Sequence, residues 1–145
     1  MPFIEWNNDF SVNNVEIDNQ HKHWICIINS LHQVLMIEGN GNIKEKVTGA
    51  LVEMNTYTRR HFAYEEMCMR RVDYPGTIEH IKLHNAFAAQ ITRYLSKIYS
   101  GELVMGTEVM ARLNSWLRDH ILIEDQKYCS YLAENKDKLT GLSFD

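Results

Sequence analysis

Apolar residues recur every three or four positions along four segments of this chain, which is the spacing of one face of an α-helix. The segments are separated at 39–42, at 73–76 and between residues 100 and 106, where helix-breaking residues gather. No segment alternates apolar and polar residues in the manner of a strand. Because short connections join antiparallel neighbours, the pattern predicts an all-α, up-down-up-down antiparallel four-helix bundle.

The two ends of the chain lack this helical stripe. Residues 1–17 contain Trp6 and Phe10 but no helical repeat, and we interpret them as an N-terminal arm that lies over the bundle. The bundle should occupy residues 18–135, and residues 136–145 should form a loosely held tail. A chain of 145 residues can bury roughly 70% of its unfolded surface, so we expect one domain spanning 1–145.

Composition and charge argue against several classes of protein. The formal net charge of -4 gives no attraction for nucleic acid or an anionic membrane. The longest apolar run, 24–28, is far shorter than the ~20 residues that span a bilayer, so no membrane insertion is expected. Residues 1–6 lack the features of a secretory signal, which favours a cytoplasmic protein. Cys26, Cys68 and Cys129 form no C-x-x-C pair and should be reduced, mostly buried thiols.

Histidine and carboxylate residues occupy the same helix faces as the apolar residues, so they should point into the middle of the bundle. His61 and Glu65 are four residues apart, as are His80 and His84, and each pair therefore shares one face. Burying such groups without partners would cost several kcal/mol in all, whereas metal ions would satisfy them. The candidate metal ligands are five imidazoles and two carboxylates: His21, His61, Glu65, His80, His84, His120 and Asp125.

This set suffices for two metal ions with one free position. If both ions are six-coordinate, twelve positions need ligands. The imidazoles fill five of them, two bridging carboxylates fill four, and one bridging oxygen atom fills two. One position stays open, and an open position on a redox metal is where a small molecule binds.

Ideal helix geometry does not explain the spacing of His120 and Asp125. Five residues correspond to a rotation of about 140°, which places the two side chains on different faces. Either Asp125 reaches across from the edge of the stripe, or the helix widens locally in a π-bulge, a feature often found at functional sites. The two remaining histidines are not expected to be ligands, because His23 should face solvent and His32 lies about three turns from His21.

The pattern resembles the hemerythrin family, and specifically its bacterial single-domain members. All seven ligand positions hold the expected residue type, including the unusual gap between His120 and Asp125. The match spans nearly the whole chain. The matching stretches are Val15–Lys22, His61–Glu66, Tyr74-Pro75 with His80 and His84, and Trp116–Ile121 followed by Asp125.

The resemblance implies a non-haem di-iron centre. Three histidines would hold one iron, two would hold the other, and both carboxylates would bridge the ions together with an oxo or hydroxo group. The iron with two histidines would be five-coordinate and would bind dioxygen. The three histidines would be His80, His84 and His120, and the two histidines would be His21 and His61. The bridging carboxylates would be Glu65 and Asp125.

The ligand types favour binding over oxygen activation. Ferritin-like di-iron enzymes use Glu-x-x-His pairs, and this sequence contains none. Two ferrous ions with two carboxylates and one hydroxide leave one positive charge, whereas four carboxylates would make the centre negative and better able to support high-valent iron. Imidazole also suits iron. We therefore expect reversible binding and no enzymatic activity.

Apolar side chains near the ligands should form the dioxygen pocket, because water beside the bound molecule would promote its loss and leave ferric iron. Leu117 lies one turn before His120 and is the best candidate for contact with dioxygen. The predicted pocket residues are Trp24, Ile25, Ile28, Phe62, Trp116, Leu117 and Ile121.

Functions from three classes fit such a site. The first is reversible dioxygen binding by a monomer, for oxygen transport, storage or delivery to an oxygen-consuming enzyme. The alternative is an oxygen or redox sensor that acts through a partner protein, which ligand-dependent association would reveal. The third is an enzyme, such as a peroxide or nitric oxide scavenger, or a hydrolase that uses other metals. Turnover with a metal other than iron would favour the enzyme.

Overall fold

The computed structural model describes residues 3–34, 43–102, 104 and 106–144 of the 145-residue chain. Its long helices are α1 (Val15–Gln33), α2 (Ile43–Arg71), α3 (Thr77–Tyr99) and α4 (Gly106–Asp119). After α4 the chain continues through a π-helical turn (His120–Glu124) and a 3-10 turn (Asp125–Tyr128) into the short α5 (Cys129–Glu134). No strand occurs among the described residues, and the all-α prediction is confirmed.

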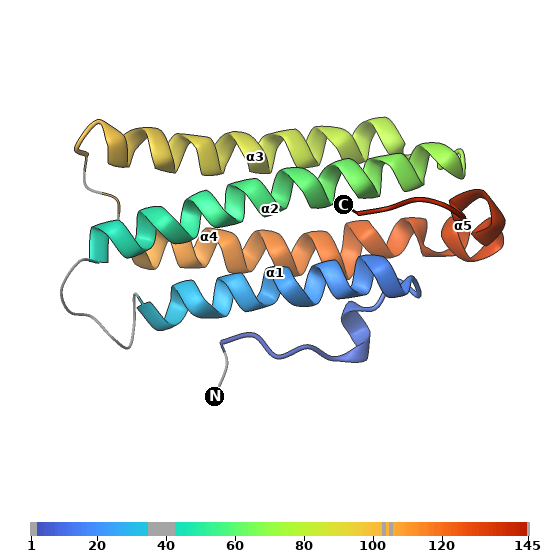
Figure 1. The fold of residues 1–145 in the computed structure, drawn as a ribbon, viewed down its shortest axis with the longest axis horizontal. Helices are drawn as coiled ribbons and strands as arrows, with labels where there is room; N and C mark the ends of the chain where they lie inside the picture. Colours follow the sequence, from blue (N-terminus) through green and yellow to red (C-terminus); the bar gives the residue numbers. More distant parts are fainter. Residues whose placement is uncertain (1–2, 35–42, 103, 105, 145) are drawn as a thin grey trace.

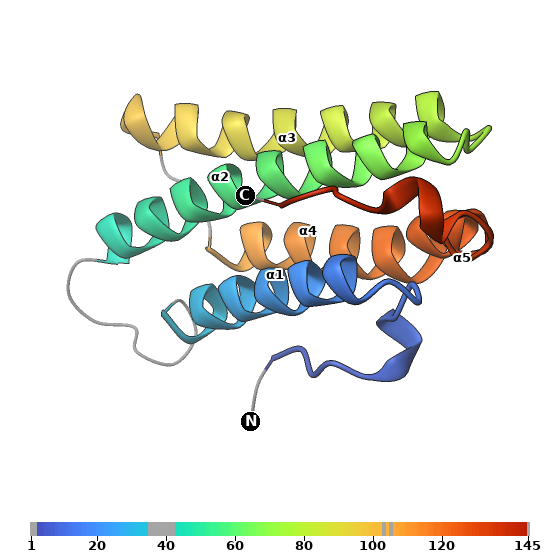
Figure 2. The same ribbon diagram turned by 45° about the vertical axis from the view of Figure 1, so that its right-hand side comes forward.

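The four long helices lie side by side, and neighbours along the chain run in opposite directions (Figure 1). α2 packs against both α1 and α3, and α1 also packs against α4. The turned view shows the same arrangement (Figure 2). The up-down-up-down antiparallel bundle is therefore confirmed. The predicted break at 39–42 lies outside the described residues.

α1 begins at Val15, three residues before the boundary that the apolar pattern predicted. Asn14 starts the helix because its side chain accepts a hydrogen bond from the Ile17 N–H at 3.0 Å. One turn further, the Asp18 carboxylate accepts a hydrogen bond from the Val12 N–H at 2.9 Å. The last residues of the N-terminal arm are thus tied to the turn of α1 that precedes the first candidate ligand.

Buried apolar side chains form two clusters, and the candidate ligands separate them along the chain. In α1, His21 lies between Ile17 of the smaller cluster and Trp24 of the larger one. The same alternation recurs at Phe62, Glu65 and Cys68 in α2 and at Ile121, Asp125 and Tyr128 after α4. The fold therefore holds a polar layer between two apolar layers, which limits the access of water to it.

The C-terminal segment is packed against the bundle. It forms a 3-10 turn at Lys136–Leu139 and then runs back beside α2 in both views (Figures 1 and 2). Leu139, Leu142 and Phe144 are partly buried against the smaller cluster. The prediction of a loosely held tail is therefore wrong, because these apolar side chains give the segment a surface to bury.

None of the described helices is long and apolar enough to cross a membrane. The three cysteines are free thiols, with Cys68 buried, Cys129 partly buried and Cys26 exposed. The expectation of mostly buried thiols is wrong for Cys26. It follows the buried Trp24 by two residues, and that spacing turns it to the opposite side of α1.

Candidate metal centre

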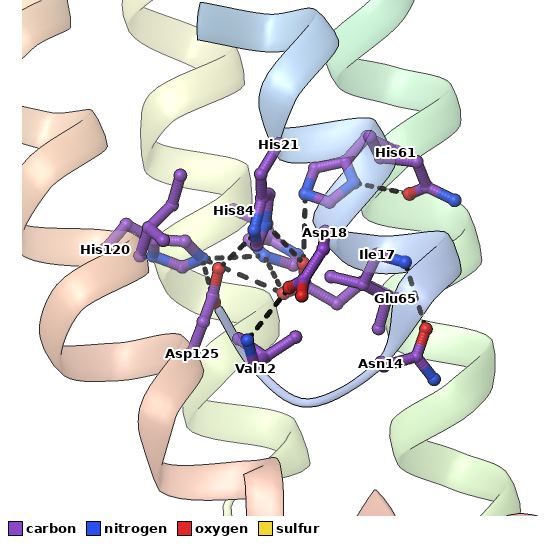
Figure 3. Close-up of polar contacts among 12 residues, drawn as sticks. Val12, Asn14, Ile17, Asp18, His21, His61, Glu65, His84, His120 and Asp125 are labelled. Carbon is purple, nitrogen blue, oxygen red and sulfur yellow. Dashed lines mark hydrogen bonds and ion pairs between the residues drawn. The ribbon is translucent and has the colours of Figure 1, made fainter. Parts of the chain in front are cut away.

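The structure brings all seven candidate ligands together in the middle of the bundle, where each is at most 3% exposed. They come from three of the four long helices, α1, α2 and α3, and from the turns that follow α4. Figure 3 shows imidazoles from several helices surrounding two carboxylates. By element, the residues are His21 in α1; His61 and Glu65 in α2; His80 and His84 in α3; and His120 and Asp125 after α4.

One group contains three histidines and both carboxylates. Oε1 of Glu65 lies 2.9 Å from Nε2 of His80 and 3.2 Å from Nε2 of His84. Oδ1 of Asp125 lies 3.0 Å from Nε2 of His80 and 2.9 Å from Nε2 of His120. One potential ligand atom from each of these five residues lies within 4.8 Å of the other four. This group could hold one metal ion.

A second group uses the other oxygen atoms of the same carboxylates. Oε2 of Glu65 lies 3.0 Å from Nε2 of His61 and 3.7 Å from Nε2 of His21. Oδ2 of Asp125 lies 3.2 Å from Nε2 of His21. Each carboxylate therefore presents one oxygen to the three-histidine group and one to the two-histidine group. That is the arrangement a bridging carboxylate requires.

Buried atoms of the cluster have too few hydrogen-bond partners. Nε2 of His21, both oxygens of Asp125 and Oε2 of Glu65 lie near groups of opposite charge but form no hydrogen bond, and Nδ1 of His21 has no hydrogen-bond partner either. Nε2 of His84 faces Nε2 of His120 at 3.1 Å, and only one proton can lie between two such nitrogens. Buried polar atoms are normally paired. Cations between these imidazoles and carboxylates would satisfy them, and this set of atoms suits iron.

The pKa values show how strongly the histidines and carboxylates depend on one another. Burial acts to lower the pKa of His21, but Asp125 and Glu65 outweigh it and raise that pKa to about 9. The same carboxylates raise the pKa of His80 to about 10 against the effect of burial. Burial acts to raise the pKa values of both carboxyl groups, yet the imidazoles hold them well below their usual range. The buried carboxylates therefore favour the protonated forms of His21 and His80.

The backbone after α4 explains how His120 and Asp125 meet. The Asp125 N–H donates to the His120 carbonyl oxygen, which is the hydrogen bond of a π-helix. Of the two alternatives that the sequence left open, the π-bulge is the one the structure contains. The wider turn allows side chains five residues apart to lie on one side of the helix.

Gln20 belongs to the centre and was missed by the sequence analysis. It is 2% exposed, and its Oε1 lies 2.6 Å from Nδ1 of His61. Its position next to His21 carried a weak signal, because a polar residue beside a buried ligand on a helix often faces a neighbouring helix. The contact joins α1 to α2, however, and only the packed structure reveals it.

Aromatic rings cover the side of the centre that faces the larger apolar cluster. Phe62 stacks on His84 with ring centroids 3.7 Å apart, and Trp116 stacks on His120 at 4.2 Å. Trp24 lies 5.5 Å from the ring of His61. Three predicted pocket residues therefore contact candidate ligands directly. Phe87, which the sequence analysis did not name, stacks on Trp116 at 3.9 Å and completes this aromatic layer.

The other four predicted pocket residues lie in the larger cluster. Ile25, Ile28, Leu117 and Ile121 are each at most 4% exposed and belong to the same apolar cluster as Trp24 and Phe62. The two histidines that were not expected to be ligands belong to neither group. His23 is exposed beside Tyr57, and His32 stacks on Phe3 with ring centroids 4.2 Å apart.

Comparison with known proteins agrees with this geometry. Residues 13–132 match the model of the hemerythrin HHE cation binding domain. A bacteriohemerythrin of Pseudomonas aeruginosa is 31% identical over 139 residues, covering 96% of this chain and 88% of that protein. A bacteriohemerythrin of Stenotrophomonas maltophilia is 30% identical, covering 88% of this chain and 80% of its own length.

Relatives with other names and solved structures agree as well. The hemerythrin subunit beta of Lingula reevii is 29% identical, and the match covers 85% of this chain and 90% of that protein. A crystal structure of wild-type hemerythrin superposes with a TM-score of 0.83 at 24% identity, covering 90% of this chain and 98% of that one. By its domain match and its relatives, the chain belongs to the hemerythrin family.

Proposed function

We propose that the chain binds dioxygen reversibly at a non-haem di-iron centre and serves in oxygen transport, storage or delivery. The hemerythrin family, together with the buried histidine and carboxylate cluster, supports a non-haem iron protein that binds oxygen. The proposal adds iron as the metal, the bridged pair of ions, and reversibility. Delivery to an oxygen-consuming enzyme by a monomer is the physiological role that we propose.

The unequal division of the imidazoles is the observation that carries this proposal. Three histidines gather at one end of the two carboxylates and two at the other. We assign one iron to the larger set and the second iron to the smaller set, with both carboxylates bridging. The larger set is His80, His84 and His120, and the smaller set is His21 and His61. The two carboxylates are Glu65 and Asp125. When bound, iron at the smaller set would supply a redox-active ion with a free position for dioxygen.

The protein itself supplies position, charge and exclusion of water. The imidazoles add no negative charge, so the cluster has fewer anionic groups than a carboxylate-rich site would have. The aromatic rings of Trp24, Phe62, Phe87 and Trp116 pack together on one side of the centre, and each candidate ligand is at most 3% exposed. Both features favour release of an intact dioxygen molecule over its further reduction.

The decisive experiment follows one preparation through a cycle. Iron is quantified per chain, the protein is reduced without oxygen, air is admitted, and oxygen is then removed under vacuum while the visible spectrum is recorded. A charge-transfer band that appears with air and disappears under vacuum supports the proposal. A single irreversible change, or a preparation that holds another metal and no iron, would contradict it.

A matched pair of histidine variants tests the assigned ligands. His61→Leu should reduce the iron content and abolish the reversible band, because it removes one of the two imidazoles of the smaller set. His23→Leu removes an exposed histidine that belongs to neither group, and it should leave both measurements unchanged. Equal iron content and equal bands in the two variants would exclude His61 as a ligand.

A further inference from the structure

A buried hydrogen bond links the side chains of Gln20 and His61 behind the centre. Oε1 of Gln20 lies 2.6 Å from Nδ1 of His61, and both residues are at most 2% exposed. The Gln20 amide is held from its other end, because its Nε2 donates to Oε1 of Glu16 at 3.3 Å. A carboxylate can only accept, so this contact fixes the amide with its oxygen toward His61.

That orientation determines which nitrogen of His61 carries the proton. An amide oxygen accepts hydrogen bonds, so the proton must lie on Nδ1 of His61. In a neutral imidazole the other nitrogen then has a free electron pair. That nitrogen, Nε2, lies 3.0 Å from Oε2 of Glu65 and has no hydrogen-bond partner of its own. Two electron-rich atoms at this distance repel each other unless a metal ion lies beside them or a second proton binds to Nε2.

The backbone around Gln20 also holds α1 and α2 in register at this level. The Tyr57 hydroxyl of α2 donates to the backbone carbonyl of Gln20 at 3.0 Å. Both the main chain and the side chain of Gln20 are thus bonded to α2. A residue with two such connections can hold the His61 ring at a fixed angle.

The two halves of the centre differ in the groups behind their histidines. Nδ1 of His84, in the three-histidine group, lies 3.7 Å from the carboxylate of Glu66. Behind His61 the corresponding group is a neutral amide. A carboxylate behind a ligand histidine increases the basicity of the imidazole and stabilises the ferric state, whereas an amide orients the ring without adding charge.

From these contacts we infer that Gln20 is a positioning residue that fixes the ring and tautomer of His61 and, being uncharged, favours the ferrous state of the two-histidine half of the centre. This inference rests on the proposed function for the identity of the metal. Its part about the His61 tautomer depends only on residues of this chain.

Two substitutions separate orientation from charge. Gln20→Glu keeps the shape and the oxygen that accepts from His61, but it adds a negative charge and removes the donor to Glu16, so it should lower the reduction potential of the iron centre and speed autoxidation several-fold. Gln20→Leu keeps the approximate volume but removes the acceptor, so it should weaken iron binding by about 10-fold or more. Gln33→Glu makes the same charge change at the exposed C-terminal end of α1 and is the matched control.

The reduction potential is measured by spectroelectrochemistry, and the His61 tautomer is read from imidazole nitrogen NMR on the metal-free protein at neutral pH. We expect the proton on Nδ1 in the parent and in Gln33→Glu, and loss of this preference in Gln20→Leu. A parent in which Nδ1 of His61 carries no proton would overturn the inference. So would a potential in Gln20→Glu equal to that of Gln33→Glu.

These readouts distinguish the inference from the proposed function. Irreversible reaction with air, combined with the expected tautomer and potential shift, would reject oxygen carriage and retain the role of Gln20. Gln20→Glu preserves the shape of the side chain, so it tests the inference even if Gln20→Leu fails to fold.

Discussion

Nε2 of His120 lies 2.9 Å from Oδ1 of Asp125, although five residues separate them in the sequence. A regular α-helix would turn these side chains about 140° apart. The π-helical turn between them removes that mismatch because it contains one more residue than an α-helical turn. The Asp125 N–H therefore donates to the His120 carbonyl oxygen. The backbone is thus irregular at the point where two candidate ligands must share one side of the helix.

Metal removal should loosen this π-helical turn. Ions held by both His120 and Asp125 would fix the turn from the side-chain end, while the π-helical hydrogen bond alone is a weak constraint. We expect the Asp125 amide to exchange about 10-fold faster in the metal-free protein, a change of about 1.4 kcal/mol in local opening. Hydrogen exchange measured by NMR on both forms tests this.

The middle of α3 provides an internal control for that measurement. Ile91 and Leu95 are buried in the larger apolar cluster and belong to neither candidate ligand group, so their amides should respond less to the metal. Identical protection of the Asp125 amide with and without metal would show that the turn is held by backbone packing alone.

The sequence predicted some residues of the candidate centre but not others, and individual residues show why. His61 and Glu65 could be paired from the sequence because helical periodicity fixes which residues share a face. The sequence could not decide whether the Asp125 side chain reaches toward His120 from the edge of the helical stripe or a π-bulge brings the two together. That choice depends on local backbone hydrogen bonding. Gln20 was missed because its burial depends on where α2 packs, which is a tertiary contact with no periodic signal.

The metal-free protein should lose stability as the pH rises from 7 to 10. The pKa of His21 is raised to about 9 and that of His80 to about 10 in the folded state, against 6.5 when unfolded. Groups with raised pKa values stabilise fully below the unfolded value and lose this contribution as pH passes the folded one. For His21 alone the loss is on the order of 3 kcal/mol. Urea unfolding of metal-free protein across this range measures it.

Acid should destabilise the same protein for separate reasons. The pKa values of Glu65 and Asp125 are held below their ordinary values, so their contribution is present above about pH 4.5 and is lost as the pH falls. The effect of burial outweighs that of Glu65 and lowers the pKa of His61, so protonation of this residue below pH 6.5 also opposes folding.

His21→Asn should reduce the loss of stability between pH 7 and pH 10. An unchanged alkaline slope in that variant would show that His21 isn't the group responsible.

Leu117→Asn should make the iron-loaded, oxygenated protein autoxidise about 10-fold faster than the parent, which corresponds to about 1.4 kcal/mol in the barrier. Leu117 is fully buried, one turn before His120, and an amide there would bring water or a proton donor to the pocket. Decay of the charge-transfer band in air measures the rate. Leu113→Asn is the control, because Leu113 is similarly buried at 1% exposure and lies one turn farther from His120. Equal rates in the two variants would remove Leu117 from the pocket.

Phe144→Ala should lower the free energy of unfolding by about 1–2 kcal/mol without changing the iron content. The Phe144 ring lies 5.7 Å from the ring of Tyr57 and 6.0 Å from that of Tyr64, and Cζ of Arg60 lies 4.7 Å from its centroid. These contacts hold the C-terminal segment against α2 but include none of the candidate ligands. Urea unfolding of the metal-loaded variant and parent measures the change.

Tyr99→Ala removes an aromatic ring that is 69% exposed, and it should alter stability by less than about 0.5 kcal/mol. Because a segment that is undocked in solution would lose nothing on truncation of its ring, equal stability of Phe144→Ala and Tyr99→Ala would contradict the packed C-terminal segment.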